Sequence, residues 1–164
     1  MIEKYQAYLD MGGVNSITQN GNNVLHYCVS SGADTFLMID LINHGIDPLQ
    51  KNIFNQTPMH MLNSLQSASY FTIWNFRTFS KMERLTDIEG NTIAHSAAIN
   101  KKKDIVLFLL KEYPQLKNIK NNLGLTPEQI LFLNNNPFLN QNYQSTNFFE
   151  LPRPKERGFL FHWK

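Results

Sequence analysis

Short apolar stretches alternate with polar, turn-forming stretches along most of the chain. Three apolar stretches are typical of helices, at residues 36–42, 70–79 and 105–110. A shorter helical pattern precedes each of them, and these patterns hold Val24, Leu25, Met59, Leu62, Ala94, Ala97 and Ala98. Helices this short are not stable alone. Each must bury its apolar face against neighbours, at roughly 1.5–3 kcal/mol per large side chain. The pattern therefore predicts an all-α chain of stacked helix pairs.

The polar stretches before the shorter helices share one motif. Their first residues are Gly21, Asn55, Gly90 and Gly124, which are 34, 35 and 34 positions apart. Glycine, or asparagine at position 55, suits the positive φ angle of a tight turn. A threonine two residues later, at positions 57, 92 and 126, can cap a helix. Proline then occupies the first helical position at 58 and 127, and the pair at 126 and 129 forms a capping box. The sequence predicts a repeat of turn, helix, loop and helix.

These residues resemble the ankyrin repeat family, whose helices start with T-P-L-H and whose period is near 33. Thr57-Pro58-Met59-His60 is similar to that start, and His26 and His95 keep its histidine in two further segments. The segment 41–47 is similar to the family's Leu-Leu-x-x-Gly-Ala-Asp ending, and so is the segment 8–15. The resemblance covers roughly residues 5–135 and implies an ankyrin-repeat solenoid with hairpin-like fingers.

The expected array covers residues 1–137 and the expected tail covers residues 138–164. Within the array, residues 1–17 are a partial repeat, residues 18–51, 52–86 and 87–120 are repeats, and residues 121–137 are a degenerate C-terminal repeat. The tail is an extended aromatic segment with too many apolar residues for a disordered one: Phe148, Phe149, Leu151, Phe159, Phe161 and Trp163. We expect it to pack on the array as a cap. The alternatives are that it inserts into a partner or covers the concave face.

Charge, apolar run length and cysteine content argue against some partners and locations. The net charge of +2 on 164 residues is too small to favour nucleic acid as the partner. The longest apolar run, residues 105–110, is too short for membrane insertion. The single Cys28 excludes an internal disulfide and suits a reducing compartment, so the expected location is cytoplasmic. The composition, rich in Asn, Ile and Lys, also resembles ankyrin proteins that intracellular bacteria deliver into host cells or that some protists encode. A bacterial effector in the host cytosol is therefore the second expectation.

The sequence does not favour catalysis, a cofactor or a metal. His26, His60 and His95 recur at the repeat period, but successive repeats are about 10 Å apart, and metal ligands must lie about 2 Å from one ion. The resemblance implies instead that these histidines hydrogen-bond backbone between repeats. Cys28 lies on another helix face from His26, and no nucleotide-binding or paired-cysteine motif is present. An enzyme with an unrecognised site, and a structural spacer or subunit of a larger assembly, are the alternatives to a binding module.

The resemblance implies that the turns form a row of tips and that the first helices line an adjoining concave face. Exposed apolar residues at tips do not contribute to the core, so we expect them to contact another protein and not a small molecule. The candidate partner-binding residues are Asn20, Asn22, Ile53, Phe54, Gln56, Ile88, Glu89, Asn91, Leu123, Leu125, Tyr27, Met61, Leu65 and Ile99. The alternative is that some of them pack on the neighbouring tip. The basic run Lys101-Lys102-Lys103 is either a solvated loop or a contact for an acidic partner.

Overall fold

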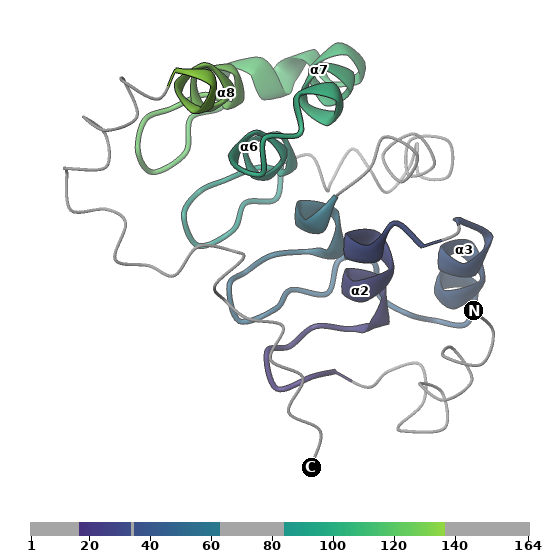
Figure 1. Cartoon of the computed structure of the whole chain (residues 1–164). Coiled ribbons are helices and arrows are strands. Elements are labelled where there is room, and N and C mark those ends of the chain that lie inside the picture. Colours follow the sequence, from purple (N-terminus) through teal and green to yellow (C-terminus); the bar gives the residue numbers. More distant parts are fainter. Residues whose placement is uncertain (1–16, 34, 63–83, 137–164) are drawn as a thin grey trace.

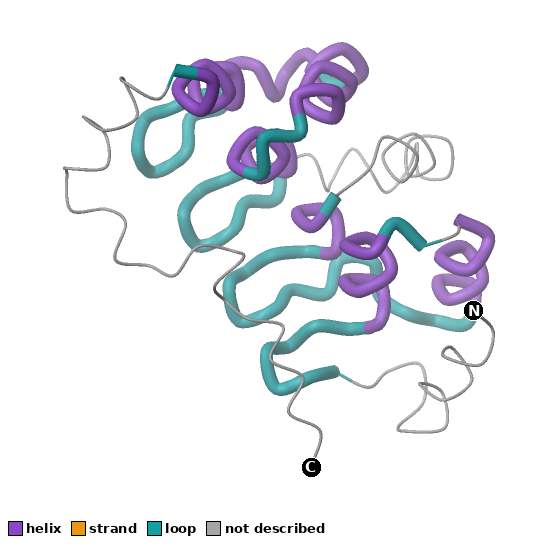
Figure 2. The backbone as a smooth tube through the Cα atoms, in the orientation of Figure 1, coloured by secondary structure: helices purple, strands orange, loops and turns teal. Residues whose placement is uncertain are grey.

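The structure is a computed structural model that describes residues 17–33, 35–62 and 84–136. The regular structure of these residues is helical, without a strand (Figure 2). The α-helices are α2 (Val24–Ser31), α3 (Thr35–Asn43), α6 (Ile93–Ile99), α7 (Lys103–Glu112) and α8 (Pro127–Asn135). Two 3-10 helices are η1 (Pro58–Met61) and η2 (Pro114–Asn118). Within these ranges no helix is long and apolar enough to cross a membrane. The prediction of a helical chain is confirmed for the described residues.

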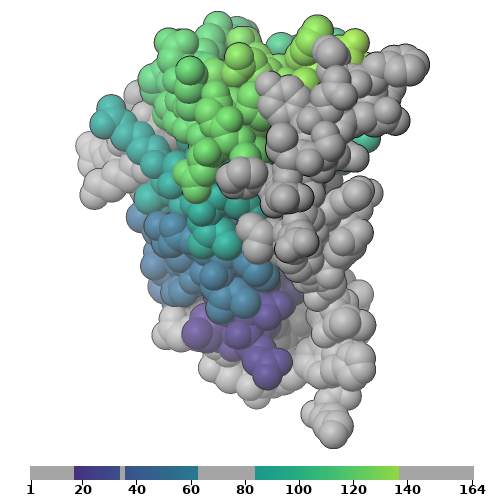
Figure 3. Space-filling model, turned by 90° about the vertical axis from the view of Figure 1, so that its left-hand side faces the viewer, coloured from purple at the N-terminus to yellow at the C-terminus, as the bar shows by residue number. Residues whose placement is uncertain are grey.

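Four loops, which we call fingers 1 to 4, each lead into a first helix. The fingers are residues 18–22, 52–56, 87–91 and 121–125, and the helices that follow them are α2, η1, α6 and α8. Neighbouring first helices contact one another in chain order, and α3 and α7 pack on α2 and α6 (Figure 1). Figure 3 shows the same order as layers coloured from purple to yellow-green. We call a finger with the helices that follow it a unit.

The predicted second helices at residues 36–42 and 105–110 are confirmed as α3 and α7. Gly45 ends the first of these segments as expected, with a φ angle of 93° and a hydrogen bond from its N–H to the carbonyl of Ile42 at 2.9 Å. Only a residue without a side chain adopts this backbone freely. The second ends at Glu112, two residues before Pro114, because proline has no N–H with which to continue an α-helix.

One predicted helix is shorter in the structure, and other predictions cannot be compared with it. The helix expected to hold Met59 and Leu62 is only the 3-10 turn η1, because Leu62 is extended, with φ −53° and ψ 123°. The predicted helix at 70–79, most of the partial repeat at 1–17 and the tail at 138–164 lie outside the described residues.

The core lies between the first and second helices. Leu25, Met59 and Ile93 from first helices are fully buried, as are Leu41 and Leu109 from second helices. Helix α6 contributes three buried alanines, Ala94, Ala97 and Ala98, which let the neighbouring backbones approach closely. Burial of the large side chains at roughly 1.5–3 kcal/mol each stabilises helices that are too short to be stable alone.

A histidine three residues after the capping residue completes the start of three first helices. The backbone N–H of the capping residue donates to Nδ1 of the histidine at 3.1 Å in each unit. Because a backbone N–H can only donate, Nδ1 carries no proton, and the proton of the neutral ring is on Nε2. The capping residues are Asn23, Thr57 and Thr92, and the histidines are His26, His60 and His95.

The Nε2 atoms of these histidines connect each unit to the next. They donate to the carbonyl oxygens of Gln56 at 3.1 Å, Asn91 at 3.1 Å and Leu125 at 2.9 Å. Each acceptor is the last residue of the following finger and immediately precedes the next capping threonine. The bonds therefore fix one helix start relative to the next. Burial lowers the pKa of all three imidazoles, which keeps them neutral at pH 7.

The fourth unit replaces the histidine with glutamine. The N–H of Thr126 donates to Oε1 of Gln129 at 2.9 Å, and the N–H of Gln129 donates to Oγ1 of Thr126 at 3.3 Å. This is the predicted capping box, and it is confirmed. Gln129 makes no bond beyond its own unit within the described residues.

Candidate functional site

The four fingers have the same backbone hydrogen bonds. In each, the N–H of the first residue donates to the carbonyl of the fifth at 2.9–3.0 Å. The N–H of the fourth residue donates to the carbonyl of the first at 2.8–3.1 Å. The fourth residues have φ angles of 60–76° and are Gly21, Asn55, Gly90 and Gly124. The sequence prediction of positive φ angles at these four positions is confirmed, and the pattern gives every finger the same tight tip.

A side-chain oxygen holds the tip of fingers 2, 3 and 4. In these fingers the first residue is Asn52, Asp87 or Asn121, and its Oδ1 accepts the N–H groups two and four residues later at 2.8–3.1 Å. This side-chain turn fixes the conformation of the second to fifth residues of the finger. The sequence analysis missed these three residues. Their signal in the sequence is an Asn or Asp three residues before the positive-φ position of fingers 2, 3 and 4.

Backbone bonds between tips place the fingers side by side. The N–H groups of Ile53, Ile88 and Asn122 donate to the carbonyls of Asn20, Phe54 and Glu89 at 3.0–3.1 Å. Each of these bonds joins the second residue of one finger to the third residue of the finger before it. Figure 2 shows the four fingers as successive teal loops on one side of the first helices. The tips therefore form one continuous row.

Two candidate partner-binding residues are placed wrongly by the sequence analysis. Asn22 and Asn91 are 6% and 1% exposed. Their Oδ1 atoms accept the Nδ2–H groups of Asn52 and Asn121 in the next finger, at 3.0 and 2.9 Å. A buried amide needs such partners. These two residues therefore hold neighbouring fingers together and are not available to a partner.

The exposed apolar residues of the tips are where the sequence analysis expected them. Ile53 is 60% exposed, Ile88 49% and Leu123 41%. They come from fingers 2, 3 and 4, and Ile53 and Ile88 occupy the same position in their fingers. Asn20 at the tip of finger 1 is exposed too. The structure thus brings three large apolar side chains to the tips of three consecutive, hydrogen-bonded fingers.

The other candidates are less accessible. Phe54, Gln56, Glu89 and Tyr27 are half-buried. Leu125, Met61 and Ile99 are also half-buried, and they pack against the core. Leu125, Met61 and Ile99 therefore pack within the structure, which was the alternative to contact with a partner. Leu65 lies outside the described residues.

Chemically reactive groups of the described residues are engaged in the fold. Both ring nitrogens of His26, His60 and His95 already have hydrogen-bond partners, which leaves neither free to bind a metal. The described residues contain no group of three metal-ligating side chains. Cys28 is buried, and burial raises the pKa of its thiol to about 11, so little thiolate forms at neutral pH.

Comparison with known proteins gives no further identification. No model of a known protein family matches the chain, and no curated protein is similar to it.

Proposed function

We propose that this chain is an ankyrin-type solenoid that binds another protein through its finger tips. Three recurrences support the ankyrin-type fold: the 34- or 35-residue spacing, the histidine that joins each helix start to the next finger, and the bonds between tips. Arrays of this kind use a preformed surface made by successive repeats.

The row of exposed tips carries the proposal of protein binding. Ile53, Ile88 and Leu123 are apolar and exposed, although the backbone around them is fixed by hydrogen bonds. Their burial by a partner would stabilise a complex by roughly 1.5–3 kcal/mol for each fully buried side chain. Little backbone ordering would oppose that gain, because the fingers are already rigid. Half-buried Tyr27 on the adjoining first helix α2 would extend the same surface.

The test is affinity capture with the intact chain and a variant that carries Ile53→Asp, Ile88→Asp and Leu123→Asp. The matched control is Phe36→Asp on α3, which changes another exposed apolar residue, 79% exposed, away from the fingers. All three proteins are first compared by circular dichroism and thermal unfolding. A captured protein is then purified, and its affinity for each form is measured by titration calorimetry.

The proposal requires a partner that the intact chain and the Phe36→Asp control bind equally and that the tip variant binds at least about tenfold more weakly. Equal binding by the tip variant would contradict it and would direct attention to another surface. Absence of any partner would favour the spacer alternative. The cytoplasmic location and the role as a bacterial effector stay predictions from composition.

A further inference from the structure

Helix α8, the first helix of the last described unit, exposes the face that earlier first helices use to meet the next unit. His26, His60 and His95 mark that face, since they bond to the following finger, and residues one before and three after them lie on the same side of a helix. The residues one before are Leu25, Met59 and Ala94, all fully buried. The equivalent residues of α8, Glu128 and Gln129, are polar and exposed.

Phe132 on the same helix, α8, is apolar, unlike Glu128 and Gln129. Its equivalents Val29 and Ala98 are fully buried, whereas Phe132 is 58% exposed. On the neighbouring helix α7, Leu107 is 53% exposed. The helices α7 and α8 and the 3-10 helix η2 contact one another and form one end of the described molecule. Single exposed apolar residues are common on proteins, so Phe132 and Leu107 indicate an interaction site only together with the charge around them.

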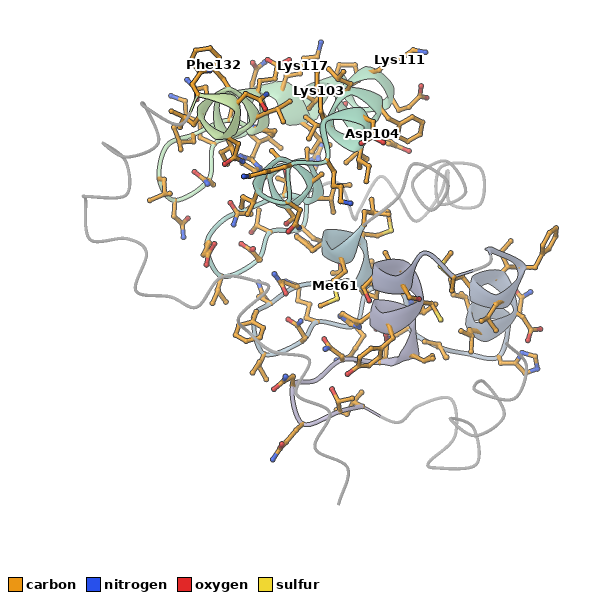
Figure 4. All side chains as sticks on the ribbon, in the orientation of Figure 1. Met61, Lys103, Asp104, Lys111, Lys117 and Phe132 are labelled. Atoms are coloured by element: carbon orange, nitrogen blue, oxygen red, sulfur yellow. The ribbon has the colours of Figure 1, made fainter. Side chains whose placement is uncertain are left out.

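Positive charge is concentrated at the same end. Residues 101–136, which include α8, contain six lysines and three carboxylates, a net charge of +3, although the whole chain carries only +2. Lys103 and Lys111 flank Leu107 on one stripe of α7, one turn to either side. Figure 4 shows Lys103, Lys111 and Lys117 with Phe132 along this end of the molecule. None of these three lysines forms an ion pair within the described residues.

We propose that this end surface, made of Phe132, Leu107, Lys103, Lys111 and Lys117, binds an acidic segment of another protein that contains aromatic or aliphatic residues. The carboxylates of such a segment would pair with the lysines, while its apolar side chains would cover the two exposed apolar residues. Residues 137–164 of the chain itself carry a net charge of +2, so like-charge repulsion disfavours them as the occupant. This surface is separate from the finger tips.

The test measures fluorescence anisotropy of a labelled synthetic peptide in which Asp and Glu alternate with Phe and Leu, titrated with the full chain. One variant carries Lys103→Glu, Lys111→Glu and Lys117→Glu, and a second carries Phe132→Ser. The matched control is Lys51→Glu, which reverses an exposed lysine just before finger 2. A tip variant, Ile53→Asp with Ile88→Asp, separates this proposal from the proposed function. Circular dichroism checks that each variant folds.

The expected result is about tenfold weaker binding for the triple lysine variant and for Phe132→Ser, and about tenfold weaker binding of the intact chain at high salt. The Lys51→Glu and tip variants should bind within about twofold of the intact chain. Equal binding by the triple lysine variant or by Phe132→Ser overturns the proposal. So does binding to anionic lipid vesicles in place of the acidic peptide.

Discussion

Fingers 2 and 3 meet differently from the fingers on either side of them. At the outer junctions, between fingers 1 and 2 and between fingers 3 and 4, a buried asparagine amide donates to an asparagine of the previous finger. At the middle junction Asp87 replaces the donating asparagine, and Gln56 replaces the accepting one. An ionised carboxylate has no proton to donate. Among the described residues no side-chain hydrogen bond joins these two positions.

The comparison distinguishes the bonds found at every junction from the bonds found only at the outer junctions. The backbone bond between tips and the bond from histidine Nε2 occur at all three junctions, including the middle one. The oxygens of Asp87 accept bonds from Glu89 and Asn91 of their own finger instead. At this junction the side-chain amide of Asn55 also donates to the carbonyl of Thr86 at 2.9 Å. We infer that two units can stack without the bond between asparagine side chains and that this bond adds stability at the outer junctions.

Among changes at the junctions, the largest effect is expected from His60→Ala at the middle junction. The change removes the bond to Asn91, leaves the N–H of Thr57 without its acceptor and opens a cavity. The free energy of unfolding, measured with urea, should fall by about 2–4 kcal/mol. The control is the exposed His44→Ala, which should cost less than about 1 kcal/mol. Equal effects of the two changes would mean that the buried histidine bonds do not hold the junction.

Acid should weaken the structure through the same histidines. Burial lowers the pKa of these histidines below the ordinary value of 6.5. Just below pH 6.5 they are therefore protonated in the unfolded chain and still neutral in the folded chain. The histidines contribute fully to the free energy of unfolding above pH 6.5. Below pH 6.5 this contribution falls, by up to about 1.4 kcal/mol per pH unit for each histidine, until the pH reaches the pKa of the folded state.

The pH effect is tested by comparing the intact chain with His60→Gln, which copies Gln129, the residue at the histidine position of the fourth unit. Urea unfolding of both proteins is measured at several pH values below 6.5. The slope of stability against pH should be smaller in the variant by up to about 1.4 kcal/mol per pH unit. Identical slopes would show that His60 does not titrate between the folded and unfolded states.

A reciprocal exchange tests the amide bonds. Asn121→Asp removes the bond to Asn91 and places a carboxylate beside its Oδ1, so it should lower the free energy of unfolding by about 1–2 kcal/mol. Asp87→Asn keeps an oxygen for the N–H groups of Glu89 and Asn91 and loses only the 3.2 Å bond from Asn91 Nδ2, so it should change stability by about 1 kcal/mol or less. The reverse order, measured by urea unfolding at pH 7, would contradict the distinction between the junctions.

The smallest effects are expected at the tips. Ile53 and Ile88 lie on either side of the middle junction and are largely exposed. Their single changes to Asp should alter the free energy of unfolding by less than about 0.5 kcal/mol, whereas the buried Ile93→Ala should cost about 2–5 kcal/mol. Thermal unfolding is a sufficient measurement. A loss above about 1 kcal/mol at either tip would mean that these residues pack across the junction and do not face a partner.

Local features of the fold could be predicted from the sequence, because their causes lie within a few residues. Asn55 and the three finger glycines were assigned to positive φ angles, and the box of Thr126 and Gln129 was assigned correctly. The burial of Asn22 and Asn91 could not be predicted in this way. Their partners lie 30 positions further along the chain, and the pairing depends on how neighbouring fingers align.

The candidate site shows the same division. The exposed residues Ile53, Ile88 and Leu123 follow from the position of the tips, which the repeat period determines. Packing of Met61 and Ile99 against the core depends on contacts between helices, which the sequence pattern does not specify. Phe132 was not singled out, because its exposure becomes notable only beside the buried residues at the same position in earlier units.

Hydrogen exchange of the backbone amides, with and without a captured partner, tests the proposed binding through the tips most directly. In the free chain the N–H groups of Ile53, Ile88 and Asn122 should exchange slowly, because each donates to the neighbouring finger. Addition of the partner should slow exchange further across fingers 2 to 4 and leave α3 unchanged. Protection confined to α3 or to the end formed by α7 and α8, with the fingers unaffected, would contradict the account.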